Sequence, residues 1–196
     1  MNYEGNDKMN LEIFRLINNL ANKNRVLDDI MIFFTNYVPY MFMLIVAFIF
    51  ILGVARKNSE YQKAAINVFF LAVINLTLNF LIGNIFYVNR PFVNNKVNLI
   101  LPHVQDASFP SDHAAGTMSI AIGLGKYNRL LGTILTILSF IVGFSRIYVG
   151  HHYPLDVVGA YIIVFITSNL YSYKIRGIVD KLYDRIINKA IHRVKR

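Results

Sequence analysis

The chain has 196 residues, of which 55% are hydrophobic and only 16% are charged. This apolar content exceeds what a soluble domain of that length buries, and the formal net charge of +9 comes without any nucleic-acid-binding motif, so it indicates basic flanks of membrane spans. The absence of cysteine excludes disulfides, a thiolate nucleophile and cysteine metal ligands.

Residues 1–29 are predicted to form an amphipathic N-terminal segment on the membrane surface. From Met9 to Ala21 the apolar residues recur at roughly helical spacing. The first twenty residues contain Glu4, Asp7 and Glu12 and no uninterrupted apolar stretch, which does not fit a cleavable secretory signal. We therefore expect the segment to belong to the mature protein, and a packed helix is the alternative.

Residues 30–173 are predicted to be the transmembrane core of a single membrane-embedded domain, 1–196. Two uncharged runs, 30–55 and 64–89, are each long enough to cross a hydrocarbon core that needs about 20 helical residues. Three shorter runs need flanking residues to span. The predicted spans cover residues 37–55, 64–88, 111–126, 130–148 and 153–173. The sequence thus predicts an all-α integral membrane protein, a bundle of about five to six transmembrane helices.

Residues 174–196 are predicted to form a basic amphipathic helix that faces anionic lipid at the membrane surface. Its apolar stripe consists of Ile175, Val179, Leu182, Ile186, Ala190, Ile191 and Val194. Its other face holds Lys181, Arg185, Lys189 and Arg193. Cytoplasmic segments carry an excess of lysine and arginine, so this tail and the connections 56–63 and 126–129 are expected inside.

Polar or ionisable residues stand at the ends of the spans that this topology places on the outer face. They are Arg90, Ser111, His113, Arg146, His152 and Asp156. Two arginines, a serine and a helix N-terminus suit a phosphate group. The two histidines offer a nucleophile and an acid for phosphoryl transfer. Asp156 follows His152 by four residues, so on a helix its carboxylate can reach one ring nitrogen and leave the other free to attack.

A zinc site built from His151, His152 and Asp156 is a competing interpretation, because histidine and carboxylate are both competent zinc ligands. Two arginines on the same face would repel a dication, so no metal is expected. Lys96 and Asp106, in the outer loop, are expected to be solvated. Asparagines on one side of the second span are expected to form interhelical hydrogen bonds; they are Asn67, Asn75 and Asn79.

Three blocks of the sequence resemble the signature of the type 2 phosphatidic acid phosphatases and the related vanadium haloperoxidases. Arg90-Pro91 is similar to the end of the first block, which in the family opens with a lysine seven residues before the arginine. Pro110-Ser111-Asp112-His113 is similar to the family's Pro-Ser-Gly-His. In the third block, Ser145-Arg146 followed by His152 and Asp156 keeps the family's spacing. The sequence around these blocks resembles that of the bacitracin-resistance undecaprenyl diphosphatases. It reads Arg-Pro-Phe, Asp-Ala-Ser-Phe-Pro-Ser-Asp-His and Gly-Phe-Ser-Arg-Ile-Tyr-Val-Gly-His-His-Tyr-Pro.

The resemblance implies a role for each residue and a reaction without metal or cofactor. His152 would form a phosphohistidine, Asp156 would orient it and His113 would protonate the leaving group. The phosphate would be bound by Arg90, Ser111 and Arg146. The expected reaction is hydrolysis of the terminal phosphate of undecaprenyl diphosphate, a polyprenyl diphosphate, on the extracytoplasmic face of the cell membrane. Such a reaction supports lipid-carrier recycling for cell-wall synthesis and bacitracin resistance.

Two other functions remain open, and the sequence differs from the family's motifs at two positions. The enzyme could act on phosphatidylglycerophosphate or another glycerolipid phosphate, or the chain could be a non-catalytic component that binds or transports a lipid diphosphate. Gly83 stands where the family has lysine, so Lys96, His103 or His151 compensates or the site needs less positive charge. Asp112 replaces glycine and brings a negative charge next to the phosphate, which should lower affinity for phosphate unless Asp112 caps the third span or pairs with an arginine.

Overall fold

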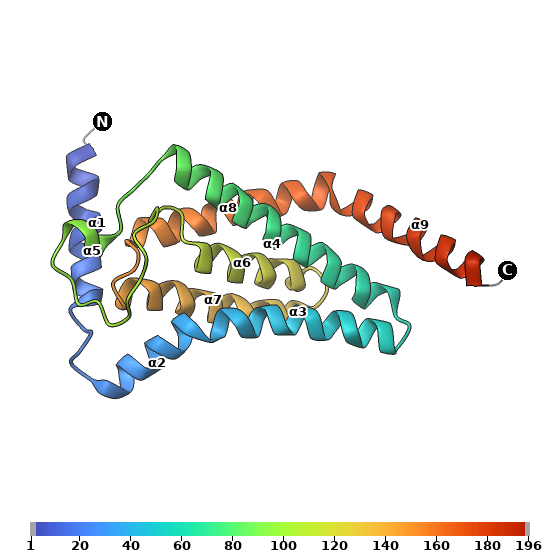
Figure 1. Ribbon diagram of the computed structural model, residues 1–196, viewed down its shortest axis with the longest axis horizontal. Coiled ribbons are helices and arrows are strands. Elements are labelled where there is room, and N and C mark those ends of the chain that lie inside the picture. Colours follow the sequence, from blue (N-terminus) through green and yellow to red (C-terminus); the bar gives the residue numbers. More distant parts are fainter. Residues whose placement is uncertain (1–2, 195–196) are drawn as a thin grey trace.

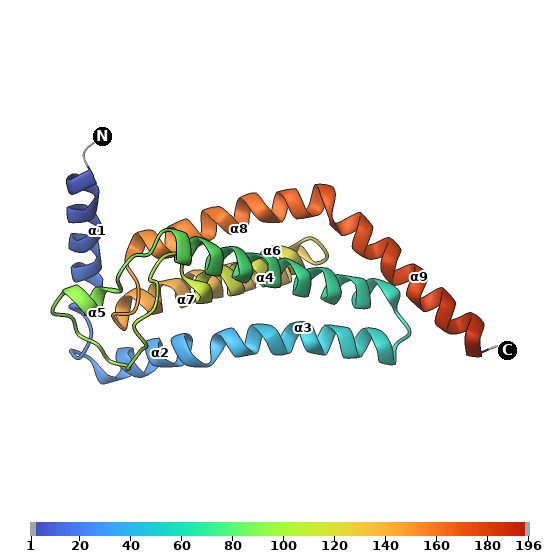
Figure 2. The same cartoon turned by 45° about the horizontal axis from the view of Figure 1, so that its top comes forward.

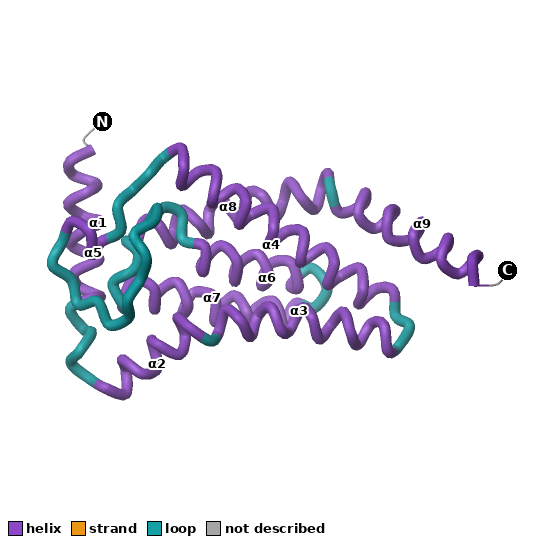
Figure 3. Tube along the Cα trace, in the orientation of Figure 1, coloured by secondary structure: helices purple, strands orange, loops and turns teal. Residues whose placement is uncertain are grey.

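The computed structural model describes residues 3–194, with side chains described for residues 8–187, and this part of the chain is helical without strands (Figures 1 and 3). Its helices are α1 (Tyr3–Asn18), α2 (Arg25–Asn36), α3 (Val38–Ala55), α4 (Ser59–Ile85), α5 (Pro91–Asn94), α6 (Asp112–Gly125), α7 (Arg129–Tyr148), α8 (Pro154–Lys174) and α9 (Arg176–Val194). Residues 1–2 and 195–196 of the two predicted terminal segments lie outside the described residues, as do the side chains of Lys189, Ala190, Ile191, Arg193 and Val194.

Four of the described helices, α3, α4, α7 and α8, are long and apolar enough to cross a membrane. They coincide with four of the predicted spans to within a few residues. The remaining predicted span is α6, which has 14 residues and therefore rises only about 21 Å, less than the roughly 30 Å of a hydrocarbon core. The prediction of a multi-pass all-α membrane bundle is confirmed.

Helix α6 forms the centre of the bundle, where it packs against α3, α4, α7 and α8 (Figure 1). Its close contact with α7 depends on two glycines: a Cβ atom on Gly132 would lie 2.3 Å from the Cα atom of Gly125. Burial of α6 explains why a short and weakly amphipathic helix is stable here, because tertiary packing supplies most helical stability in proteins.

Asparagine side chains set where two of the membrane helices begin. Asn58 accepts hydrogen bonds from the backbone amides of Glu60 and Tyr61 at the start of α4. Asn128 accepts from the amide of Leu131 at the start of α7. Such N-caps satisfy amides that have no partner within the helix, and each contributes about 1 kcal/mol.

The N-terminal segment forms two helices at one end of the bundle. Helix α1 crosses that end (Figures 1 and 2), and its Phe14 is fully buried in a cluster with Ala114 and Val157. The side chain of Asn18 in α1 donates to the backbone oxygens of Asn98 and Tyr148, at 2.9 and 2.8 Å. Helix α1 is thus packed onto the loops that surround the site described below.

Helix α9 leaves the opposite end of the bundle (Figure 2). It contacts α4 through polar side chains, including Lys63–Asp184 at 2.9 Å and Asn67–Asp180 at 2.8 Å. Three of its apolar side chains, Ile178, Leu182 and Ile186, are exposed. We call the end that holds α1 the outer end and the end that holds α9 the inner end.

Candidate active site

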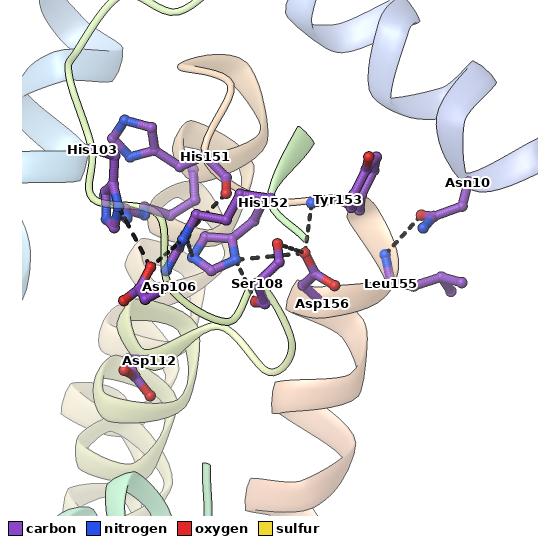
Figure 4. Close-up of polar contacts among 12 residues, drawn as sticks. Asn10, His103, Asp106, Ser108, Asp112, His151, His152, Tyr153, Leu155 and Asp156 are labelled. Carbon is purple, nitrogen blue, oxygen red and sulfur yellow. Dashed lines mark hydrogen bonds and ion pairs between the residues drawn. The ribbon is translucent and has the colours of Figure 1, made fainter. Parts of the chain in front are cut away.

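Three connections meet at the outer end of the bundle and carry the site: the long loop between α4 and α6, the short loop between α7 and α8, and the first turn of α6 (Figure 4). The short loop turns at Gly150, whose φ of +90° favours glycine. The turn places His151 and His152 beneath the long loop, and Pro154 then starts α8.

His152 is 1% exposed and is held at both ring nitrogens. Its Nδ1 lies 2.8 Å from the backbone oxygen of Ser108, which can only accept, so Nδ1 carries the proton. Its Nε2 lies 3.0 Å from Nη1 of Arg90, which can only donate, so Nε2 presents its lone pair. Burial, together with the charges of Arg90 and Arg146, lowers the pKa of His152 well below its ordinary value. The ring is therefore a neutral imidazole with Nε2 available as a nucleophile.

Asp156 lies behind His152 in the first turn of α8. Its Oδ2 is 3.6 Å from Nδ1 of His152, which is an ion-pair distance and longer than a hydrogen bond. The same oxygen accepts from the Ser108 hydroxyl at 2.5 Å and from the Tyr153 amide at 2.8 Å. The carboxylate thus approaches the ring as the sequence predicted, but the nearest partner of Nδ1 is the Ser108 carbonyl (Figure 4).

The two arginines flank His152 and are both buried. Arg90 donates from Nε to Asp106 and from Nη1 to the backbone oxygen of His151, at 2.5 and 3.0 Å. Arg146 donates from Nη2 to Nε2 of His103 at 3.0 Å, and its buried Nε has no hydrogen-bond partner among the described residues. One guanidinium donor of Arg146 is therefore buried and unsatisfied.

Ser111 precedes α6 and is fully buried, and its Oγ also lacks a partner within the described part of the chain. His113, in the first turn of α6, lies within electrostatic range of Arg146 and His152. Leaving a buried donor unsatisfied costs about 1–3 kcal/mol, so such groups are rare outside functional sites. The buried, unsatisfied donors of Ser111 and Arg146 suit an oxyanion such as phosphate.

Residues 63–178 match the PAP2 superfamily. The chain belongs to this superfamily. The undecaprenyl-diphosphatase BcrC of Bacillus subtilis (strain 168) is 40% identical to it over 187 residues, covering 92% of this chain and 95% of BcrC. The crystal structure of Aquifex aeolicus LpxE superposes with a TM-score of 0.70 at 30% identity, covering 83% of this chain and 93% of LpxE.

A second solved structure shares the fold. The crystal structure of a transmembrane PAP2 type phosphatidylglycerolphosphate phosphatase from Bacillus subtilis superposes with a TM-score of 0.61 at 18% identity, covering 88% of this chain and 89% of that one. The PAP2 match and the likeness to BcrC indicate that the chain is a phosphatase of the membrane, and hence a hydrolase.

The position where PAP2 proteins carry a lysine is closely packed in this chain. A Cβ atom on Gly83 would lie 3.1 Å from the Cβ of Ala107 and 3.2 Å from the backbone oxygen of Phe109. A lysine here would have to displace the loop whose Ser108 carbonyl contacts His152. Glycine at this position thus allows the loop to approach α4.

Two histidines that the sequence suggested as substitutes for that lysine do not supply its charge. Burial lowers the pKa of His151 to about 2 and lowers that of His103 as well, so both are neutral. Instead, the neutral His103 accepts a hydrogen bond from Arg146. Neither histidine therefore replaces the missing cation.

Asp112, where PAP2 proteins have glycine, is exposed and accepts a hydrogen bond from Nδ2 of Asn79 at 3.1 Å. The sequence left open a helix cap or an arginine partner, and the structure shows neither, because Ser111 holds the N-cap position and the hydrogen-bond partner of Asp112 is Asn79. The expected interhelical bonds of the α4 asparagines are confirmed, since Asn75 also joins Thr167 of α8.

Two residues of the site were missed from the sequence. Asp106 was expected to be solvated, and although half exposed it pairs with Arg90. Ser108 contacts both His152 and Asp156. The run Asp-Ala-Ser-Phe-Pro-Ser-Asp-His contains both residues and was the available signal, but a run cannot show which side chains turn inward.

The residues of the competing zinc interpretation have other partners. Nε2 of His151 donates to the backbone oxygen of Leu101 at 2.9 Å, while Asp156 accepts from Ser108 and Tyr153. Within residues 8–187 no group of three or more histidine and acidic side chains has a geometry that could hold a metal ion.

Proposed function

We propose that the chain is an undecaprenyl-diphosphate phosphatase with its active site on the extracytoplasmic face of the cell membrane. The observation that carries the proposal is the neutral, buried His152, whose Nε2 lone pair accepts a hydrogen bond from Arg90 and whose pKa is lowered by burial and by the charges of Arg90 and Arg146. The likeness to BcrC over nearly the whole chain supports the choice of substrate. The excess of lysine and arginine at the inner end supports the orientation.

In the first step, Nε2 of His152 attacks the terminal phosphorus of the lipid diphosphate. The new N–P bond forms as the bond from that phosphorus to the bridging oxygen breaks, and undecaprenyl phosphate leaves. Arg90 already donates to Nε2, so a phosphoryl oxygen arriving there can accept the same hydrogen bond. The unsatisfied donors of Arg146 and Ser111 bind the other phosphoryl oxygens, where they stabilise the transition state.

Protons balance through His113. The negative charge of the bound diphosphate favours the protonated form of His113, which gives its proton to the bridging oxygen as that oxygen leaves with the lipid. His113 is then neutral. In the second step a water molecule attacks the phosphohistidine while His113 takes its proton, the N–P bond breaks and inorganic phosphate is released. His152 returns to the neutral form from which it started.

The position of the site suits a lipid diphosphate. His152 lies at the outer ends of α7 and α8, which are apolar membrane helices, so a polar headgroup can reach it while a prenyl chain remains in the hydrocarbon layer. The diphosphate also brings negative charge to Arg146, whose buried Nε has no hydrogen-bond partner among the described residues.

Phosphate release from undecaprenyl diphosphate by the purified protein in detergent tests the proposal. We expect release by the wild type, with and without a chelator, and none by His152→Ala. Phosphatidylglycerophosphate is assayed side by side, and faster turnover of that lipid would favour the glycerolipid alternative. Binding without release from either lipid would indicate a non-catalytic component, and inhibition by the chelator would restore the zinc interpretation.

A further inference from the structure

Ser108 is fully buried behind His152 and makes three hydrogen bonds that tie the long outer loop to the site. Its amide donates to the backbone oxygen of Val88 at 2.8 Å. Its carbonyl accepts from Nδ1 of His152 at 2.8 Å, and its hydroxyl donates to Oδ2 of Asp156 at 2.5 Å. Figure 4 shows Ser108 next to both side chains.

The distances distinguish two ways of holding the imidazole. A direct bond from Nδ1 to the carboxylate would need a separation near 2.8 Å, and the observed separation is 3.6 Å. The Ser108 carbonyl lies at hydrogen-bond distance instead. Oδ2 of Asp156 instead accepts hydrogen bonds from the Ser108 hydroxyl and the Tyr153 amide.

We propose that Ser108 is a positioning residue, whose carbonyl fixes the Nδ1–H tautomer of His152 and whose hydroxyl transmits the influence of Asp156. The inference rests on the proposed function, because it concerns the residue proposed as the nucleophile. With the proton on Nδ1, the lone pair of Nε2 points toward the phosphorus. A charge-assisted bond from a hydroxyl to a carboxylate is among the stronger hydrogen bonds, so it holds the Ser108 backbone in place.

The arrangement also serves the intermediate. When phosphorus bonds to Nε2, the ring becomes positively charged and its Nδ1–H becomes a stronger donor. The Ser108 carbonyl then stabilises the cation by a direct hydrogen bond, and the carboxylate of Asp156 stabilises it through space. Ser108 therefore affects turnover, with little effect on substrate binding.

A double-mutant cycle on kcat tests this coupling. We expect Ser108→Ala to lower kcat about tenfold, in the range usual for residues that orient a functional histidine, with KM changed less than about twofold. Asp156→Asn is expected to lower kcat about a hundredfold, and the double variant to be no more than about twofold slower than Asp156→Asn. Ser119→Ala is the matched control, because this equally buried hydroxyl donates only within α6, and it should leave kcat unchanged.

The tautomer is measured independently of turnover, by the ¹⁵N chemical shifts of the His152 ring in histidine-labelled protein. We expect Nδ1–H in the wild type and, because the Ser108 carbonyl remains, in Asp156→Asn. Loss of that tautomer in Asp156→Asn would show that the carboxylate holds the ring directly and would overturn the proposal. Wild-type kcat in Ser108→Ala, or fully multiplicative effects in the cycle, would overturn it as well.

Failure of the proposed function has a different signature. If the wild type cleaves phosphatidylglycerophosphate and not undecaprenyl diphosphate, the cycle is run on the lipid that is cleaved, and the role of Ser108 is judged there. If neither lipid is cleaved, the proposed reaction fails, and the ring shifts alone decide whether Ser108 or Asp156 sets the tautomer.

Discussion

The two ends of the bundle bury their ionisable side chains to very different extents. At the outer end, Arg90, Arg146, His152 and Asp156 are each at most 5% exposed and contact partners far away in the sequence. At the inner end, the Lys63–Asp184 pair has side chains that are 17% and 51% exposed, so solvent reaches it.

The difference shows which polar contacts carry function. Exposed ion pairs contribute about 0–1 kcal/mol and are screened by salt. Burying an ionised group costs several kcal/mol unless it is well paired, so buried charges that keep an unsatisfied donor are maintained for a reason other than stability. The outer end meets that description, because Arg146 is buried with a free Nε–H among the described residues.

The largest expected effect separates the two proposed catalytic histidines at the outer end. Loss of the nucleophile in His152→Ala should lower kcat by at least about 10⁴-fold. His113→Ala should cost only about 10²-fold, because the leaving group is itself a phosphate and needs little help from an acid. Phosphate release from undecaprenyl diphosphate measures both, and equal total loss would contradict this division of roles.

The next effect concerns the unsatisfied donor of Arg146. Arg146→Lys keeps the positive charge but removes the planar guanidinium, and we expect kcat/KM to fall about 100-fold. Circular dichroism and thermal unfolding establish whether the variant folds. Activity within a few-fold of wild type in the folded variant would show that charge alone, without the guanidinium geometry, is sufficient.

A smaller effect concerns pH and the neutral histidines of the outer end. In the folded protein the pKa of His151 is lowered from 6.5 to about 2 by burial. Below pH 6.5 the unfolded chain binds a proton that folded His151 does not, so this residue's contribution to stability is present above 6.5 and is lost as the pH falls. Relative to the wild type, His151→Gln should therefore gain about 1.4 kcal/mol per pH unit below 6.5. Thermal unfolding at pH 7.5 and 5.5 measures the difference, and parallel pH dependences would contradict it.

The smallest effect is expected at the inner end. Lys63→Ala should lower the free energy of unfolding by less than about 1 kcal/mol and leave kcat within about twofold of wild type, because the pair with Asp184 is solvated. Denaturation at low and high salt should show the small loss shrinking as salt rises. A loss of activity above about tenfold would mean that the two ends are coupled, and the contrast drawn above would fail.

Much of the fold was predictable because its signals are local. The uncharged runs anticipated α3, α4, α7 and α8, since hydrophobic length alone decides whether a helix can cross a bilayer. The predicted first span begins at residue 37, where the structure breaks between α2 and α3 just before Pro39, but α2 itself was not anticipated as a separate helix. The packing of Phe14 against α6 and α8 could not be predicted either, because an amphipathic pattern does not show which surface covers its apolar side.

The sequence by itself determined which chemical groups face the outer end, because alternation of spans across the membrane assigns each span end to a side. Only the tertiary structure decided which hydrogen bonds hold those groups. Nδ1 of His152 donates to the Ser108 carbonyl, Arg90 donates to Asp106, and Asn79 donates to Asp112. These bonds join residues that are 16 to 44 positions apart in the sequence, and they involve irregular loops. The course of such loops depends on how the helices pack, so no periodic pattern in the sequence predicts it.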